Sequence, residues 1–385
     1  MQFVLVDLPD HVHFYPFSLT RSLTEIRVGI YTIKERWDAL LSSESQVFTS
    51  PYLQSLYHAP FLEQEGVVLY INATCIPNEA IKKAILSLGE GESLLDEDGK
   101  WIASFTSDRS IGKILLGDPN LKKTIPAKFI KNAMHLLQLN AVMMQLDFNQ
   151  VISNQTSIVV DASNRLICPE NIFIAEGACL SGVSLNATDG PIYIGKNALL
   201  MEGVAIRGPF VLGEKSVVKM NASIYGATSV GPYCTIGGEI KNSILMGYSN
   251  KAHEGYLGDS IIGQWCNVGA GTSNSNVKNT AGPIQIWNQH LKSWDTVGNK
   301  MGMIVGDYTR FAIQSSINTG SYVGVSSNIY GNGLLPKMIP NFSWGITKGY
   351  QLDKAIEDIE NWKKMKGFQI SDAEKEVLTA LFHME

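Results

Sequence analysis

Apolar residues recur at every sixth position over much of residues 212–334. Two series share this spacing: Leu212, Val218, Ile224, Val230 and Ile236, then Val305, Phe311, Ile317, Val323 and Ile329. A small residue follows four positions after each, for example Ala222 and Ser315. A period of six fits neither a helix of 3.6 residues per turn nor an alternating strand, but it is typical of stacked parallel β-helix coils. We therefore expect a parallel β-helix over residues 165–345, with the large residue on its axis and the small one at a corner.

Residues 1–150 carry a different pattern, in which short apolar runs alternate with helical spacing. Residues 3–6 and 67–71 predict strands, and residues 30–41, 79–88 and 126–139 predict helices. Strands that alternate with helices predict an α/β sheet. We place the domain boundary within residues 147–170, where the sequence turns polar.

The end of the chain predicts helices again. Pro336 and Pro340 are expected to end the repeat, and residues 352–366 and 372–382 have helical spacing. A β-helix needs a cover over its open end, because an uncovered coil exposes an unpaired edge. Residues 346–385 are therefore expected to form a C-terminal helical cap.

Composition excludes several classes of protein. The 385 residues with 45% hydrophobic content suffice for two domains with their own cores. A net charge of -5 argues against a nucleic-acid partner or a basic membrane surface. The five cysteines form no CxxC pair, so neither a disulfide framework nor a metal site is indicated. Without a basic leader or a long apolar span, a cytoplasmic protein with no membrane partner is expected.

The loop over residues 16–29 of the first domain, PFSLTRSLTEIRVG, resembles the loop after the first strand of sugar-1-phosphate nucleotidyltransferases. This resemblance implies a Rossmann-like α/β nucleotidyltransferase fold. Arg21 and Arg27 could hold a nucleotide phosphate, or they could be solvated or ion-paired arginines.

Two departures from that family make the first domain a degenerate version of it. The family has a glycine-rich phosphate loop, whereas DLPDHVHFYP contains no glycine. The family also has a Mg²⁺-binding aspartate after a central strand, where this chain has Asn72, Ala73 and Thr74. Asp7 and Asp108 are possible substitutes or ordinary loop aspartates. Mg²⁺ is therefore expected only if this domain is active.

The β-helix carries more specific motifs: EIKNSI, KAHEGYLGDS and NVGAGT followed by an asparagine. His253 in the second motif lies outside the hexad register, so its side chain can leave the packed coil. An imidazole that titrates near neutrality can take a proton from an amine that attacks a thioester. His253 is therefore the candidate general base, with a structural histidine as the alternative.

These motifs closely resemble the acetyltransferase half of the bifunctional N-acetylglucosamine-1-phosphate uridyltransferase and glucosamine-1-phosphate acetyltransferase family. The resemblance implies that Lys241 holds the sugar phosphate, and that Tyr256, Asn267 and Asn276 bind the sugar. Asn267 could instead be a corner asparagine, and Tyr256 a surface ring.

The residues Ala270 and Gly271 carry no polar side chain. Their backbone could approach the thioester of acetyl-CoA and donate to its oxygen, or it could form an ordinary turn. They are the candidate residues for binding acetyl-CoA.

Two positions depart from the acetyltransferase motifs. Ser223 stands where the family has a phosphate-binding arginine, and we expect Arg207 to replace it from an adjacent coil. Lys278 only approximates the family's second lysine. Residues 277–303 interrupt the hexads and are expected to leave the prism and cover a neighbouring subunit's cleft, where Trp287 and Trp294 could pack on the pantetheine or adenine or form an interface.

The expected protein is thus a sugar-nucleotide biosynthesis enzyme with a left-handed β-helix, trimeric by resemblance. It would transfer acetyl from acetyl-CoA to the amine of a sugar such as glucosamine 1-phosphate, with or without nucleotidyl transfer to a sugar phosphate. Two alternatives stay open. One is a nucleotidyltransferase in which the β-helix only oligomerises the chain, and the other is a non-catalytic sugar-nucleotide-binding protein.

Overall fold

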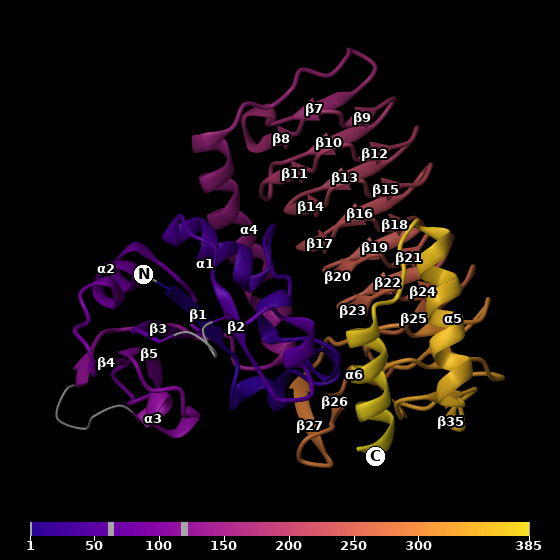
Figure 1. The fold of residues 1–385 in the computed structure, drawn as a ribbon. Coiled ribbons are helices and arrows are strands. Elements are labelled where there is room, and N and C mark those ends of the chain that lie inside the picture. The colour runs from indigo at the N-terminus through magenta and orange to yellow at the C-terminus, as the bar shows by residue number, and fades with distance from the viewer. Residues whose placement is uncertain (1, 61–64, 117–121, 385) are drawn as a thin grey trace. The chain divides into compact units, whose positions relative to one another are not determined.

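The computed structural model describes residues 2–60, 65–116 and 122–384 (Figure 1). Its residues fall into two compact units. The first comprises residues 1–14, 21–26 and 31–132, and the second comprises residues 15–20, 27–30 and 133–385. Two short stretches from the start of the chain therefore belong to the second unit.

The first unit is built on a mixed sheet with the strand order β2-β1-β3-β5-β4-β6. Its strands are β1 (Gln2–Val6), β2 (Gln46–Phe48), β3 (Val68–Asn72), β4 (Ser93–Leu95), β5 (Trp101–Thr106) and β6 (Lys122–Thr124). Its helices are α1 (Ile33–Leu41), α2 (Glu79–Leu86) and α3 (Ile111–Leu116). The parallel set β2-β1-β3 gives the unit its Rossmann-like character, while β5 runs antiparallel to β3 and β4. The predicted α/β fold is confirmed.

The helix expected over residues 126–139 is wrong in its limits, because α4 spans Ala133–Asn154. Residues 128–130 are extended and pair with residues 74–76. The Ile76 N–H donates to the Lys128 carbonyl and the Ile130 N–H donates to the Thr74 carbonyl, each at 2.8 Å. These long-range pairs override the local helical spacing.

The second unit is dominated by the β-helix, whose coils stack in a column (Figure 1). We call its three sheets the first, second and third faces. The first face contains β7 (Arg165–Ile167), β10 (Ser184–Asn186), β13 (Ala205–Arg207), β16 (Ser223–Tyr225), β19 (Glu239–Lys241) and β22 (Tyr256–Gly258). The second face contains β8 (Ile172–Ile174), β11 (Ile192–Ile194), β14 (Phe210–Leu212), β17 (Thr228–Val230), β20 (Ile244–Gly247), β23 (Ile261–Gln264), β28 (Met303–Val305), β31 (Ser321–Val323) and β33 (Met338–Ile339).

The third face contains β9 (Cys179–Leu180), β12 (Leu199–Leu200), β15 (Val217–Val218), β18 (Thr235–Ile236), β21 (Asn250–Lys251), β24 (Asn267–Val268), β29 (Arg310–Phe311), β32 (Asn328–Ile329), β34 (Ser343–Trp344) and β35 (Thr347–Lys348). β25 (Ser273–Asn274) and β30 (Ser316–Ile317) pair with each other after the first face. The predicted left-handed parallel β-helix is confirmed.

The hexad residues form the axis of the β-helix as predicted. Every large residue of the two series is at most 3% exposed. The small residues close the corners. For example, the Ser216 hydroxyl donates to the Gly231 carbonyl and accepts from the Cys234 N–H. Burial of the large residues stabilises the stack by about 1.5–3 kcal/mol for each side chain.

The expectation that Pro336 and Pro340 end the repeat is wrong. β33 pairs with β31, and β34 pairs with β32, so the coils continue beyond both prolines. The prolines lie just outside β33, where a missing N–H removes no bond from the sheet ladder.

The chain excursion after β25 is a β-hairpin, formed by β26 (Ile284–Asn288) and β27 (Ser293–Gly298). Trp287 and Trp294 pack edge to face within it, with ring centroids 5.5 Å apart. The Lys337 ammonium donates to the Gln285 carbonyl at 3.1 Å, which fastens the hairpin to a later coil of the same chain.

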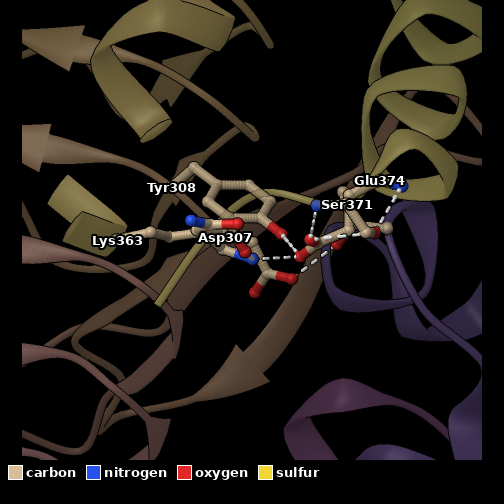
Figure 2. Close-up of polar contacts among 7 residues, drawn as sticks. Asp307, Tyr308, Lys363, Ser371 and Glu374 are labelled. Atoms are coloured by element: carbon tan, nitrogen blue, oxygen red, sulfur yellow. Dashed lines mark hydrogen bonds and ion pairs between the residues drawn. The ribbon is translucent and has the colours of Figure 1, made fainter. Parts of the chain in front are cut away.

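The C-terminal helices are confirmed as α5 (Leu352–Met365) and α6 (Asp372–His383). Glu374 of α6 accepts from the Tyr308 hydroxyl of the β-helix, 3.1 Å away, and forms an ion pair with Lys363 of α5, so it fastens α6 both to the β-helix and to α5 (Figure 2). Burial raises the pKa of Glu374, but the hydrogen bonds from Lys363 and the Ser371 N–H outweigh it and hold the pKa below its usual value. The helices lie along the later coils (Figure 1), where Lys366 also donates to the Tyr233 carbonyl at 2.6 Å.

Candidate functional site

Three neighbouring strands of the first face bring candidate side chains together. In the sheet register Tyr225 pairs with Lys241, and Lys241 pairs with Gly258. Paired residues point to the same side of a sheet, so these three positions form one outward row. The Lys241 ammonium lies 5.7 Å from the centroid of the Tyr225 ring.

Tyr256 joins this row because the residue paired with Lys241 is a glycine, Gly258. A Cβ atom on Gly258 would come within 2.3 Å of the Tyr256 hydroxyl oxygen. The phenol therefore lies over Gly258, the residue paired with Lys241. The structure thus places Lys241 and Tyr256, two predicted substrate-binding residues, next to each other.

Asp259 connects Asn276, a third predicted substrate-binding residue, to this row. The Asn276 amide donates to the Tyr256 hydroxyl at 3.0 Å and to the Asp259 carboxylate at 2.5 Å. The Asn242 amide donates to the other oxygen of Asp259 at 2.6 Å. Sequence reasoning missed Asp259 and Asn242, although both lie within the quoted motifs. The sequence did contain a signal for Asp259, because a carboxylate follows two glycines in the motif KAHEGYLGDS.

The charges in this cluster keep both phenols protonated. The Tyr225 hydroxyl donates to Glu239 at 2.5 Å, and this bond, together with burial and neighbouring negative charge, raises the pKa of Tyr225 to about 12. Burial and the charges of Asp259 and Glu239 raise the pKa of Tyr256. Both hydroxyl groups therefore remain able to donate hydrogen bonds at neutral pH.

His253 lies at the corner between the third and first faces. Its side chain is exposed, and its imidazole has no hydrogen-bond partner in the described part of the chain. The corner of the preceding coil is two residues shorter, since Ile236 and Ile240 are four apart whereas Lys251 and Leu257 are six apart. The imidazole is therefore free to meet a substrate, as the general-base prediction requires.

Ala270 occupies the equivalent corner of the next coil. Asn250 pairs with Asn267, so three residues further on His253 is matched by Ala270. The Gly271 N–H donates to the Glu254 carbonyl at 3.0 Å, which corrects the prediction that Gly271 supplies an oxyanion donor. Among the described residues, the Ala270 N–H has no acceptor and remains available next to His253.

Two predicted residues do not join the cluster within one chain. Asn267 is on the third face, where its side-chain oxygen accepts from the Asn250 amide at 3.4 Å. Arg207 is on the first face, two strands from Lys241, which is about 10 Å at the usual strand spacing. Its guanidinium is paired with Asp189 of the preceding coil, with a 3.2 Å contact from Nη2.

The N-terminal candidates are largely buried. Arg21 is 4% exposed, and Arg27 donates to the Ile30 carbonyl. Within the second unit, the Gly29 N–H donates to Asn140 at 2.8 Å and the Ile30 N–H donates to Asp147 at 2.9 Å. The segment around Arg27 thus has a structural role, and a nucleotide role for either arginine stays a prediction.

The two aspartates considered for Mg²⁺ also have local partners. Asp7 is 1% exposed and accepts from the Leu23 N–H and the Thr49 hydroxyl, each at 3.0 Å. Burial raises the pKa of Asp7 to about 6 despite these bonds. Asp108 accepts from the Ser110 N–H at 2.8 Å. Among the described residues, no three histidine, cysteine or acidic side chains are grouped as metal ligands.

Comparison with known proteins gives a family match and several similar proteins. A family model described as sugar nucleotidyl transferase matches residues 3–156. Bifunctional protein GlmU of Methanococcus vannielii is 32% identical over 133 residues, which cover 34% of this chain and 31% of that protein. The chain is similar to the GlmU proteins. This confirms the resemblance expected from the sequence.

Other GlmU matches are longer but less identical. GlmU of Thermodesulfovibrio yellowstonii is 27% identical over 46% of this chain and 38% of that protein. GlmU of Synechococcus elongatus is 26% identical over 54% of this chain and 42% of that protein. The chain thus spans about a third to two fifths of the length of these GlmU relatives.

A crystal structure of the polySia specific acetyltransferase NeuO covers 53% of this chain and 93% of its own, at 15% identity and a TM-score of 0.23. So low a score carries no inference. In the described part of the chain, no helix has the length and apolar character to cross a membrane.

Proposed function

We propose that the β-helix transfers an acetyl group from acetyl-CoA to the amine of an amino-sugar 1-phosphate, with glucosamine 1-phosphate as the model substrate. The observation that carries this proposal is the pairing of two corners. One presents an exposed imidazole, His253, and the next presents the Ala270 N–H, which has no acceptor among the described residues. Acyl transfer to an amine needs a base for the amine proton and a donor for the thioester oxygen.

The reaction balances with these two groups. His253 takes a proton from the amine as its nitrogen forms a bond to the thioester carbon. The Ala270 N–H stabilises the negative charge that develops on the carbonyl oxygen. The carbon–sulfur bond then breaks, and the imidazolium returns the proton to the CoA thiolate.

The cluster on the first face would orient the sugar. Lys241 supplies a point charge for the phosphate, the Tyr256 hydroxyl donates to a sugar oxygen, and the Asn276 side-chain oxygen accepts from a sugar hydroxyl. Arg207 would need to leave Asp189 to assist Lys241. The carboxylates of Glu239 and Asp259 would attract the substrate's ammonium before it is deprotonated.

The active form in this proposal is a homotrimer. Asn267 points from the third face and the sugar cluster lies on the first, so one chain does not bring them together. A neighbouring subunit that presents its third face to the sugar cluster would supply Asn267. The excursion hairpin would cover the same interface. An acetyl-CoA substrate places this activity in the cytoplasm.

Nucleotidyl transfer by the first unit is the second candidate function. The family match over residues 3–156 favours it. The burial of Arg21 and the local partners of Asp7 and Asp108 count against it. A non-catalytic sugar-nucleotide-binding protein is the third reading.

One assay separates these readings. The pure protein is incubated with glucosamine 1-phosphate and acetyl-CoA, with and without UTP or dTTP and Mg²⁺, while CoA thiol and pyrophosphate release are followed. We expect thiol release that His253→Ala abolishes and that His58→Ala, at an exposed position of the first unit, retains. Pyrophosphate release that His253→Ala leaves unchanged would support nucleotidyl transfer, and inactivity of the unmutated protein would support the binding role.

A further inference from the structure

Lys251 occupies an interior position of the β-helix that is otherwise apolar. It lies six residues from both Leu245 and Leu257, in the inward hexad register. The inward residues of the third face around it are Leu180, Leu200, Val218, Ile236, Val268, Phe311 and Ile329. The Lys251 side chain is 1% exposed. A lysine in this place is unexpected, because burying an ammonium group is unfavourable unless it is paired.

The ammonium of Lys251 contacts main-chain carbonyls and not a carboxylate. It donates to the His253 carbonyl at 2.6 Å and to the Gly237 carbonyl at 3.3 Å. In the described chain neither carbonyl accepts another hydrogen bond. Lys251 therefore ties together two successive corners, the short one at Gly237 and the longer one at His253.

The tie acts on the backbone that carries the imidazole. The His253 side chain has no partner that could fix its direction, so the position of its own peptide unit decides where the ring can point. Gly238 allows the two corners to approach, since a Cβ there would lie 2.8 Å from the His253 carbonyl oxygen. An aliphatic residue in place of Lys251 would fill the axis but could not donate a hydrogen bond to the His253 carbonyl.

We propose that Lys251 is a positioning residue that sets the direction of the His253 imidazole from inside the β-helix. This inference rests on the proposed acetyl transfer. Lys251 does not touch substrate and acts only through the His253 peptide. Misplacing a reacting group by about 1 Å can lower a rate on the order of 100-fold, so the loss of the tie should be visible in kcat.

The test compares Lys251→Met with Ile236→Met in the full-length protein. Both variants place methionine on the same inward column, in adjacent coils, and only the first removes the tie. We expect Lys251→Met to fold and to bind the amino sugar with KM within about twofold of the unmutated protein, while kcat falls roughly 10- to 100-fold. Ile236→Met should keep kcat within about twofold.

Two further measurements distinguish positioning from general damage to the fold. In a His253→Ala background, Lys251→Met should cause no additional loss, because its effect runs through the imidazole. In histidine-labelled protein, the NMR resonance of the His253 ring should narrow and move toward the averaged shift of a mobile histidine in Lys251→Met only.

The outcomes are separable from those of the proposed function. If the unmutated protein transfers no acetyl group, the NMR comparison still tests the positioning role. Unchanged kcat in Lys251→Met, an equal fall in both methionine variants, or an unaltered His253 resonance would overturn the inference.

Discussion

The buried carboxylate of Asp259 accepts a 2.5 Å hydrogen bond from Asn276, and the same amide donates to the Tyr256 hydroxyl. Asp259 therefore determines how two predicted sugar-binding groups face the substrate, although it was not among the residues expected to do so. It also accepts from Asn242 at 2.6 Å, so both of its oxygens are held.

Replacement of Asp259 by alanine should impair sugar binding more than chemistry. Asn276 loses the acceptor that orients it, so we expect KM for the amino sugar to rise about tenfold with kcat reduced less than about threefold. The free energy of unfolding should fall by about 1–3 kcal/mol, because buried donors lose their partner. Steady-state kinetics and urea unfolding measure the two effects.

The matched control for this variant is Asn242→Ala. Asn242 donates to the same carboxylate, but to the oxygen that Asn276 does not use. Its KM should stay within about threefold of the unmutated value. Equal KM changes in the two variants would contradict an orienting role for Asp259.

A methyl group at Gly258 should displace Tyr256. The added Cβ would lie 2.3 Å from the Tyr256 hydroxyl oxygen, so the ring must swing away while the strand is kept. We expect Gly258→Ala to lower kcat/KM about tenfold, and to have no further effect once Tyr256 is alanine. Gly349→Ala, which meets no atom within 4 Å, is the matched control. Additive losses in the double variant would show that the methyl group acts elsewhere.

Lys251 should make the stability of the β-helix vary with pH in the alkaline range. Burial lowers the pKa of Lys251 from 10.5 to about 8. Below pH 8 Lys251 is protonated in both the folded and the unfolded chain, so its buried charge has its full destabilising effect on the folded state. Between pH 8 and 10.5 only the unfolded chain keeps it, so the free energy of unfolding should rise with pH, by up to about 3 kcal/mol.

Urea unfolding of the unmutated protein and of Lys251→Met, at pH 7, 8, 9 and 10, measures this difference. The tyrosines and other groups that titrate in this range are common to both proteins and largely cancel. A constant difference from pH 7 to 10 would mean that Lys251 keeps its proton in the folded state.

Loss of the Glu374 charge should loosen α5 and α6. Lys363 is only 5% exposed and pairs with this carboxylate, so Glu374→Gln leaves a buried ammonium without its counter-ion. We expect the free energy of unfolding at pH 7 to fall by about 2–4 kcal/mol. The folded pKa of Glu374 is depressed, so its contribution is present above the unfolded pKa and disappears as pH falls through the folded value.

The control is Glu376→Gln, an exposed position on the same helix, which should change stability by less than about 0.5 kcal/mol. Near-UV circular dichroism follows the packing of the helices, since Lys363 lies 5.1 Å from the Trp265 ring centroid. Equal destabilisation of the two variants would argue that helix propensity, and not the ion pair, is responsible.

The sequence predicts the β-helix well because its signal is local. Each coil repeats the same inward spacing, so Val218 and Ile224 reveal the axis without knowledge of distant contacts. Lys251 fits the same count of six from Leu245 and Leu257, but its charge conceals the inward position. The site motifs likewise locate Lys241, Tyr256 and His253, which lie on adjacent strands or corners of one stack.

Features that depend on distant partners could not be predicted in this way. Helical spacing over residues 126–139 is overridden by pairing of residues 128–130 with residues 74–76, about 50 positions earlier. The sequence of the loop around Arg27 resembles a phosphate-binding loop. Its structural role becomes visible only in its contacts with Asn140 and Asp147. Asp259 was missed because its importance comes from Asn276, which arrives from the following coil.

The division of the chain between its two units constrains how it can be made. Thr20 donates to Asp307 at 2.5 Å, and the Gly29 N–H donates to Asn140. Their partners are synthesised more than a hundred residues later. No single cut therefore yields two intact halves, and residues 15–20 and 27–30 must wait for the much later residues of the second unit before their packing is complete.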